Sequence, residues 1–274
     1  MSVKVRDLLM GELGSLRHEP IDKRIRAQIG DRTVVDSTRA LLVWEPKRVV
    51  PQYAVPVEDI DAETVAAQTG EQAGEVSAPQ LLGRPVYDPS VPFSVHTSEG
   101  EPLSVRLPEA DREAAAFRIS DPDLEDYVVL DFDTFDAWFE EDERNVAHPR
   151  DPFHRIDIVH SSRPVRVELG GETVAESSSA AFLFEPPLPV RYYLPPEHVR
   201  QDLLRPSEKT TFCAYKGQAT YWSLGDEDDL VWTYLEPLRD AAEVRGRLAF
   251  FNERVDIVVD GEPLERPVTP WSKR

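Results

Sequence analysis

The chain has 274 residues, a hydrophobic content of 41% and a formal net charge of -20, so it is long and apolar enough for two ordinary folded domains. Such an acidic surface repels phosphate backbones and anionic lipids, and the sequence has no basic stripe, which disfavours nucleic-acid and membrane partners. The single cysteine, Cys213, excludes an intramolecular disulfide and a zinc site of paired cysteines, and we expect no cofactor or metal because no cofactor motif is present.

The first segment, residues 1–19, carries no apolar stretch of the signal-peptide type. No window of the sequence approaches the run of apolar residues that a membrane span needs. We therefore expect a soluble cytoplasmic protein, with residues 1–19 as an extension before the first domain.

An internal repeat organises the rest of the chain. Residues 24–46 align with residues 164–186 without a gap, and eight of 23 positions are identical. Two further matches follow in the same order, Gln52–Pro56 over Arg191–Pro195 and Phe117–Pro122 over Trp232–Pro237. Three collinear matches predict two diverged copies of one domain. The expected parts are a first, degenerate copy at 20–145, a Pro/His/Arg-rich joint at 146–163, a better-preserved copy at 164–265 and a tail at 266–274.

In the first copy, Asp133–Glu143 is the one segment with the pattern of a longer helix. Phe135, Trp138 and Phe139 recur there at helical spacing. The acidic run Glu140–Glu143 lies at the end of this predicted helix, where the dipole does not favour anions, and it lacks the glycine of a calcium loop. We expect that run to be a solvated face.

His148, His154 and His160 lie six residues apart in the joint. This spacing matches no usual metal site on a helix or a hairpin, and prolines interrupt the segment. We expect a rigid linker; the alternative is that Arg150 and Arg155 face a ligand between the domains.

The second copy has the pattern of β-strands. Val165, Val167 and Leu169 alternate with polar residues, which predicts a half-buried strand, and Gly170-Gly171 predicts a hairpin turn. The apolar run Ala180–Phe184 predicts a buried strand. Pro195-Pro196 predicts a short helix through Arg200, and further strands are predicted at 220–224, 230–234 and 255–259. The expected fold class is mainly β with a few short helices.

The segment Cys213–Gly217 is the best candidate for a functional site. The ammonium of Lys216 can bind an anion or, with a lowered pKa, act as a base or nucleophile. Tyr215 can donate a hydrogen bond, and Gly217 lets the backbone approach a ligand. The alternative is a surface turn that leads into the next strand, with Cys213 as a small core residue.

Arg191 and Tyr192 are the second candidate, because a guanidinium beside phenols can hold a carboxylate or phosphate, with Trp222 as a further wall. The alternative is an edge strand whose arginine pairs with Glu185 or Glu197.

Two further candidates for catalysis, after Lys216, are Glu185 and Cys213. Glu185 recurs as Glu45 in the first copy, which lacks the lysine, and this favours a structural role over that of a general base. Cys213 with His198 would form a nucleophile pair, although nothing in the spacing requires it.

The chain resembles a bacterial family named domain of unknown function 427, in a tandem form. The resemblance rests on Glu185-Pro186, Arg191–Pro196, Cys213–Gly217 with Tyr221-Trp222, Ala249–Asn252 and the joint His148–Pro152. It implies compact Mss4-like, or β-tent, domains, in which small antiparallel sheets lean together. Many β-tent proteins bind zinc through paired cysteines, which this chain lacks. The family is sometimes labelled nucleotidyltransferase-like, but the one dense acidic run of the second copy, Asp226–Asp229, has no phosphate-binding glycine loop beside it.

Two classes of function survive. We expect the second copy, or the interface between the copies, to bind a small anionic metabolite through Lys216 and Arg191, with Tyr192, Tyr215 and Trp222 as walls and with catalysis left open. A monomer whose two copies mimic a homodimer would use the first copy as a scaffold. The alternative is a non-enzymatic module for protein–protein interaction. Convergence of Lys216, Arg191 and Tyr215 on one concavity would favour the ligand site.

Overall fold

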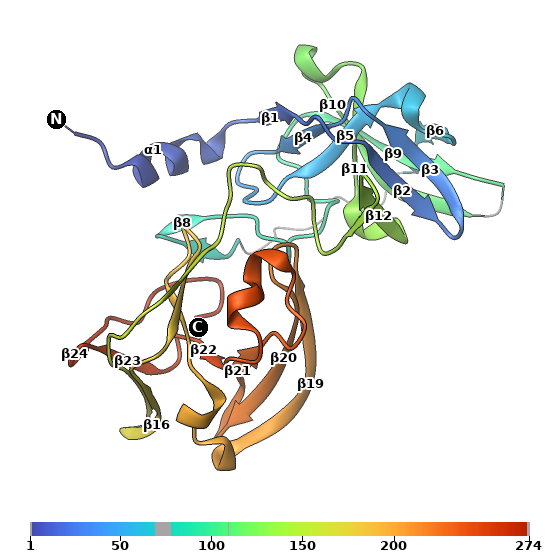
Figure 1. Ribbon diagram of the computed structural model, residues 1–274. Coiled ribbons are helices and arrows are strands. Elements are labelled where there is room, and N and C mark those ends of the chain that lie inside the picture. Colours follow the sequence, from blue (N-terminus) through green and yellow to red (C-terminus); the bar gives the residue numbers. More distant parts are fainter. Residues whose placement is uncertain (1, 69–77, 109, 273–274) are drawn as a thin grey trace. The chain divides into compact units, whose positions relative to one another are not determined.

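The computed structural model in Figure 1 describes residues 2–68, 78–108 and 110–272. The chain divides into two compact units, residues 1–79 with 85–151 and residues 80–84 with 152–274. Antiparallel strands dominate both units, which confirms the mainly β fold class. No helix in the described ranges is long and apolar enough to cross a membrane. Residues 273–274 of the predicted tail lie outside the described residues.

The first unit contains two antiparallel sheets, drawn from blue to green in Figure 1. Seven strands follow the order β1-β4-β5-β11-β10-β9-β6, and four follow the order β13-β12-β2-β3. The elements in chain order up to residue 145 are α1 (Val5–Gly11), η1 (Glu12–Gly14), β1 (Arg17–Pro20), β2 (Ile25–Ile29), β3 (Arg32–Ser37), β4 (Leu41–Trp44), β5 (Gln52–Pro56), η2 (Val57–Asp59), β6 (Glu63–Ala66), β7 (Gln80–Leu81), β8 (Arg84–Pro85), β9 (Gly100–Arg106), β10 (Asp111–Ile119), η3 (Pro122–Leu124), β11 (Tyr127–Leu130), η4 (Phe132–Thr134), β12 (Ala137–Glu140) and β13 (Glu143–Asn145).

The second unit repeats this topology. The orders β14-β17-β18 and β22-β21-β20-β19 match successive parts of the seven-stranded sheet, and the bridge between Leu194 and Leu248 joins them. The order β24-β23-β15-β16 matches the four-stranded sheet, so the predicted internal repeat is present in the fold. The elements are β14 (Asp157–His160), β15 (Val165–Leu169), β16 (Glu172–Ser177), β17 (Ala181–Phe184), β18 (Arg191–Tyr193), η5 (Pro196–His198), η6 (Gln201–Leu203), β19 (Leu204–Cys213), β20 (Gly217–Leu224), β21 (Glu227–Thr233), η7 (Arg239–Val244), β22 (Ala249–Phe250), β23 (Asp256–Val259) and β24 (Glu262–Pro263).

The predicted hairpin forms in both repeats. Val165 and Val167 are fully buried and alternate with half-buried polar residues along β15, as the period-two pattern predicts. Gly170 and its equivalent Gly30 open the two turns with φ of 60° and 58°, a left-handed conformation that favours glycine. The register shifts at the same place in both hairpins, between Val167 and Glu168 in the second. A shared bulge is a further sign of common architecture.

Each unit has a core between its two sheets. In the first unit, Ile25 and Ala27 of β2 pack with Leu42 of β4 and Tyr53 of β5. In the second unit, a cluster that includes Val165, Phe182, Tyr192 and Ile257 holds the equivalent place. A second cluster on the other face of the β17-β18 sheet includes Leu183 and Tyr193, so β18 is buried on both faces.

The predicted helix Asp133–Glu143 is wrong. The segment forms the end of the short 3-10 helix η4 and then strand β12, which pairs with β2 on one side and β13 on the other. Trp138 is buried with its indole Nε1 2.8 Å from the Phe132 carbonyl, whereas Phe139 lies on the opposite face beneath the Arg26 guanidinium. Helical spacing arose because a bend at Phe135 and Asp136, and not a helix, leads into the strand that carries Trp138. Glu140 is also not simply a solvated residue, because its carboxylate accepts hydrogen bonds from Tyr53 and Lys23.

Candidate functional site

Lys216 and Glu185 form a buried ion pair in the second unit. The Lys216 Nζ lies 2.6 Å from both carboxylate oxygens of Glu185, and the two residues are 8% and 7% exposed. Glu185 follows β17 and Lys216 ends the turn between β19 and β20, so the pair ties this turn to β17. The His154 Nε2 lies 3.4 Å from Glu185 Oε1, and the His154 and Tyr215 ring centroids are 4.8 Å apart.

This pairing keeps both groups charged. Burial by itself raises the pKa of Glu185, but Lys216 and His154 outweigh that effect and lower the pKa to about 2. Burial likewise lowers the pKa of Lys216, but the neighbouring Cys213 and Glu185 outweigh it, so the pKa lies above its ordinary value. An ammonium that is held protonated against its own carboxylate is poorly placed to act as a base or nucleophile.

The equivalent glutamate in the first unit also anchors a loop. Glu45 is 3% exposed, and its carboxylate accepts hydrogen bonds from the backbone N–H groups of Thr97 and Ser98 at 2.8 and 3.0 Å. The His96 Nδ1 lies 2.9 Å from the same carboxylate. These residues precede β9, just as Lys216 precedes β20. The recurring glutamate therefore holds the segment that leads into the same strand of both repeats, with different partners.

Arg191 is bound in a second buried ion pair, with Glu253 and not with Glu185 or Glu197. Its Nη1 and Nη2 lie 2.7 and 2.8 Å from the two Glu253 oxygens, and Glu253 also accepts a hydrogen bond from the Thr269 hydroxyl at 2.6 Å. The guanidinium lies over the Trp271 ring at 5.5 Å from its centroid. Arg191 thus fastens the segment after β24 to the sheet.

The remaining sequence candidates lie apart from one another. The turn before Gly217 is buried and not on the surface, and a Cβ on Gly217 would meet Leu238 at 3.3 Å. The His198 Nδ1 lies 2.8 Å from the Ser177 hydroxyl, and Cys213 ends β19. Trp222 lines a pocket of about 230 Å³ together with Pro196, Gln201, Leu204, Thr233, Leu235, Gly246 and Leu248.

The histidines of the joint also have separate neighbours. The His160 Nε2 lies 2.9 Å from Glu243, and the His148 Nδ1 lies 2.7 Å from the Pro149 carbonyl. Within the described ranges, no three His, Cys, Asp or Glu side chains gather as a metal site would require.

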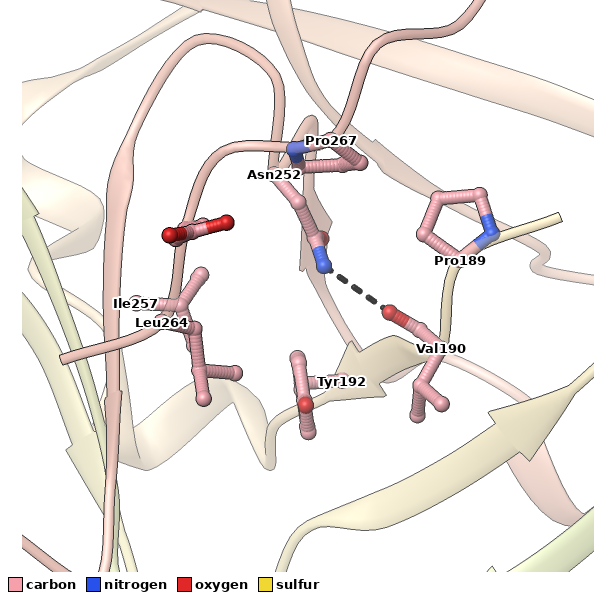
Figure 2. Close-up of a pocket in the computed structure, with 8 residues that line it drawn as sticks. Pro189, Val190, Tyr192, Asn252, Ile257, Leu264 and Pro267 are labelled. Carbon is pink, nitrogen blue, oxygen red and sulfur yellow. Dashed lines mark hydrogen bonds between the residues drawn. The ribbon is translucent and has the colours of Figure 1, made fainter. Parts of the chain in front are cut away.

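A second pocket, of about 150 Å³, lies within the second unit, and we call it the Tyr192–Asn252 pocket. Figure 2 shows Asn252 and Tyr192 on opposite sides of it, with Ile257 and Leu264 along one wall. Its lining comprises Pro189, Val190, Tyr192, Asn252, Ile257, Leu264, Glu265 and Pro267. Neither Lys216, Arg191 nor Tyr215 lines this pocket or the Trp222 pocket, so the predicted convergence on one of these concavities is not found.

Aromatic side chains fill the equivalent place in the first repeat. Ala27 pairs with Trp138, and its repeat equivalent Val167 pairs with Ile257, so Trp138 and Ile257 occupy the same strand position. The registers of β10 with β11 and of β21 with β22 likewise make Phe132 equivalent to Asn252. In the first repeat Phe132 stacks on Trp138 with their ring centroids 5.4 Å apart. The Trp138 ring centroid also lies 5.1 Å from that of Tyr53, which is the equivalent of Tyr192. The second repeat has smaller side chains at both filling positions.

The two tyrosines also differ in their hydrogen bonds. The Tyr53 hydroxyl donates to Glu140 at 2.6 Å and accepts from the Asn145 amide at 2.8 Å. In the second repeat, the apolar residue Val259 occupies the position of Glu140, and the apolar residue Leu264 occupies that of Asn145. No hydrogen bond to the Tyr192 hydroxyl is found in the part of the chain that the structure describes.

Asn252 presents a second unpartnered polar atom. Its Nδ2 donates to the Val190 carbonyl at 2.8 Å, which fixes the orientation of the amide, as Figure 2 shows. Its Oδ1 is buried and accepts no hydrogen bond within the described residues, although Asn252 is only 7% exposed. A buried acceptor without a partner costs about 1–3 kcal/mol.

Sequence reasoning named Tyr192 but missed the rest of this pocket. Asn252 belongs to the Ala249–Asn252 motif, yet no chemical pattern marked it as part of a site. The pocket becomes evident when Trp138 is compared with Ile257, and this comparison requires the strand register of both repeats.

Comparison with known proteins agrees with the repeat. No curated protein matches the chain. One family model matches it, over residues 17–76 and again over residues 157–261, and each match covers strands of one repeat. The chain therefore belongs to the family described as domain of unknown function (DUF427), and it carries two segments of that family in tandem.

Proposed function

We propose that the second repeat binds a small molecule in the Tyr192–Asn252 pocket. The observation that carries this proposal is the contrast between the repeats: Trp138 and Phe132 fill the position in the first, whereas Ile257 and Asn252 leave a pocket of about 150 Å³ in the second. A concave, mostly apolar pocket with a few polar atoms is the usual form of a small-molecule site.

The unpartnered atoms of Tyr192 and Asn252 strengthen this proposal. Buried polar groups in folded proteins almost always have hydrogen-bond partners, so the enclosed, unpartnered Asn252 Oδ1 is unusual, whereas the Tyr192 hydroxyl stays accessible to a partner. The Trp222 pocket is larger, but its lining residue Thr233 already donates its hydroxyl to the Arg247 carbonyl at 2.6 Å. Its polar lining therefore gives less support for a ligand.

An anionic metabolite, the ligand class expected from the sequence, remains a prediction. Its support came from Lys216 and Arg191, and both cations are paired with buried carboxylates of their own. We therefore base the proposal on the pocket and not on these cations, and we assign no reaction to it.

Native mass spectrometry of the freshly purified protein tests this function. We expect a small adduct of fixed mass on the wild type that is lost in Ile257→Trp, because this substitution installs the side chain that fills the first repeat. Val159→Trp adds the same group at a position that is 49% exposed and should keep the adduct.

If no adduct survives purification, a set of small fragments is screened by ligand-observed NMR against the same three proteins. Fragments that bind the wild type and Val159→Trp but not Ile257→Trp support the proposal. Binding that persists in Ile257→Trp, or no binding at all, contradicts it and favours the interaction module.

A further inference from the structure

The lining of the Tyr192–Asn252 pocket also points to the chemical class of its ligand. Resting on the function proposed above, we infer that the ligand is a compact apolar molecule that carries a protonated amine. Three features of the pocket support this class: its size, the hydrogen-bonding character of its polar atoms and the sign of its charge.

The size and walls of the pocket set the body of the ligand. A dry cavity of about 150 Å³ in another protein holds one benzene molecule. Pro189, Ile257, Leu264 and Pro267 supply apolar walls, and Leu264 is 41% exposed, so the pocket reaches the surface. A single ring or a short branched chain fits this space.

The polar atoms of the lining favour a ligand that donates a hydrogen bond. The Asn252 amide is oriented by its bond to Val190, and its Oδ1, which can only accept, is enclosed in the wall of the pocket. The Glu265 carboxylate also only accepts when it is ionised. Burial raises the pKa of Tyr192 despite the opposing charge of Arg163, so its phenol stays neutral and can accept as well as donate.

The charge of the lining disfavours an anion. Glu265 is the one charged residue among the eight that line the pocket. Arg163, the cation whose charge lowers the pKa of Tyr192 against the effect of burial, already pairs with Asp260. A carboxylate ligand would lose hydration without gaining a positive partner, whereas an ammonium gains the Glu265 carboxylate.

Isothermal titration calorimetry with three ring compounds tests this class at neutral pH: benzylamine, benzyl alcohol and benzoate. Because a charged donor makes the stronger hydrogen bond, we expect benzylamine to bind about tenfold more tightly than benzyl alcohol, and benzoate not to bind. Glu265→Gln, at an exposed position, should lower the affinity for benzylamine several-fold and that for benzyl alcohol by less, because only the amine carries a positive charge. Ile257→Trp should abolish both.

The outcomes separate this inference from the proposed function. Equal binding of benzyl alcohol and benzylamine, or tighter binding of benzoate, overturns the amine class while the pocket stands. The amine class is also overturned if Glu265→Gln prefers benzylamine over benzyl alcohol as strongly as the wild type does, because the inferred charge preference depends on that carboxylate. If none of the three compounds binds the wild type, both the amine class and the small-molecule site are contradicted and water is the occupant of the pocket.

Discussion

Ile257 in the second repeat occupies the strand position of Trp138 in the first, because each residue pairs with the same position of the repeated hairpin. The same sheet framework thus holds an aromatic cluster in one repeat and a pocket in the other. Duplication lets one copy keep a filled core while the other changes the side chains at two positions. This internal pair provides matched controls for the tyrosine and isoleucine experiments below.

The two equivalent tyrosines should respond differently to loss of the hydroxyl. Tyr53→Phe removes two hydrogen bonds and leaves Glu140 Oε1 and the Asn145 amide nitrogen without their Tyr53 partner, so it should destabilise the protein by about 1–3 kcal/mol. Tyr192→Phe removes a hydroxyl with no partner among the described residues and should change stability by less than about 0.5 kcal/mol. Calorimetric unfolding of both variants checks this, and equal losses would contradict the difference in bonding.

Removal of Lys216 should be costly unless its carboxylate is removed with it. Lys216→Met leaves Glu185 buried without its main partner and should destabilise the protein by about 3–5 kcal/mol in urea unfolding. The double variant with Glu185→Leu should recover most of that loss, because no charge is then left unpaired. Lys209→Met, which breaks a more exposed pair with Asp229, should cost less than about 1 kcal/mol. A double variant no more stable than Lys216→Met would contradict this account.

Acid should loosen the turn before β20. The pKa of Glu185 is about 2 in the folded protein against an ordinary value of 4.5, so the folded state favours its ionised form. The stabilisation is therefore complete above pH 4.5 and is lost as the pH falls towards 2. Hydrogen exchange of the segment 214–220 should show falling protection across that window in the wild type. In Glu185→Gln the same segment should be less protected at the start and change less with pH, and identical profiles would refute the role of the ion pair.

The segment after β24 should act on the pocket from a distance. Leu264, Glu265 and Pro267 line the pocket, while Thr269 bonds to Glu253 and Trp271 lies over Arg191. Trp271→Ala removes this fastening without touching the pocket and should weaken benzyl alcohol binding several-fold. The control is Val268→Ala, at a position that is 64% exposed, and it should leave benzyl alcohol binding unchanged. Unchanged affinity in Trp271→Ala would show that the pocket wall does not depend on the fastening.

Local patterns in the sequence predicted the strands well, because alternation and glycine turns act over a few residues. Val165, Val167 and Leu169 with Gly170 defined a hairpin that the structure confirms. The same kind of reasoning failed at Phe135 and Trp138, where a turn between two strands reproduced the spacing of a helix. Helical spacing alone does not separate these cases when the segment is short.

The surroundings of the candidate site residues were harder to predict because their partners are distant in the sequence. Arg191 and Lys216 stood out as cations, but Glu253 lies 62 residues from the first and Glu185 lies 31 from the second. The pocket depends on side chains that are small where the other repeat has large ones. That difference is visible only once Trp138 is placed on Ile257 by strand pairing.

The most direct test of the pocket is methyl NMR of isoleucine-labelled protein titrated with benzyl alcohol. This neutral probe does not depend on the inferred amine class. The account predicts that the Ile257 methyl shifts progressively and saturates, whereas Ile25 and Ile29, in the filled first repeat, stay in place. A stationary Ile257 signal at saturating probe, or equal shifts in both repeats, would contradict a binding site confined to the second repeat.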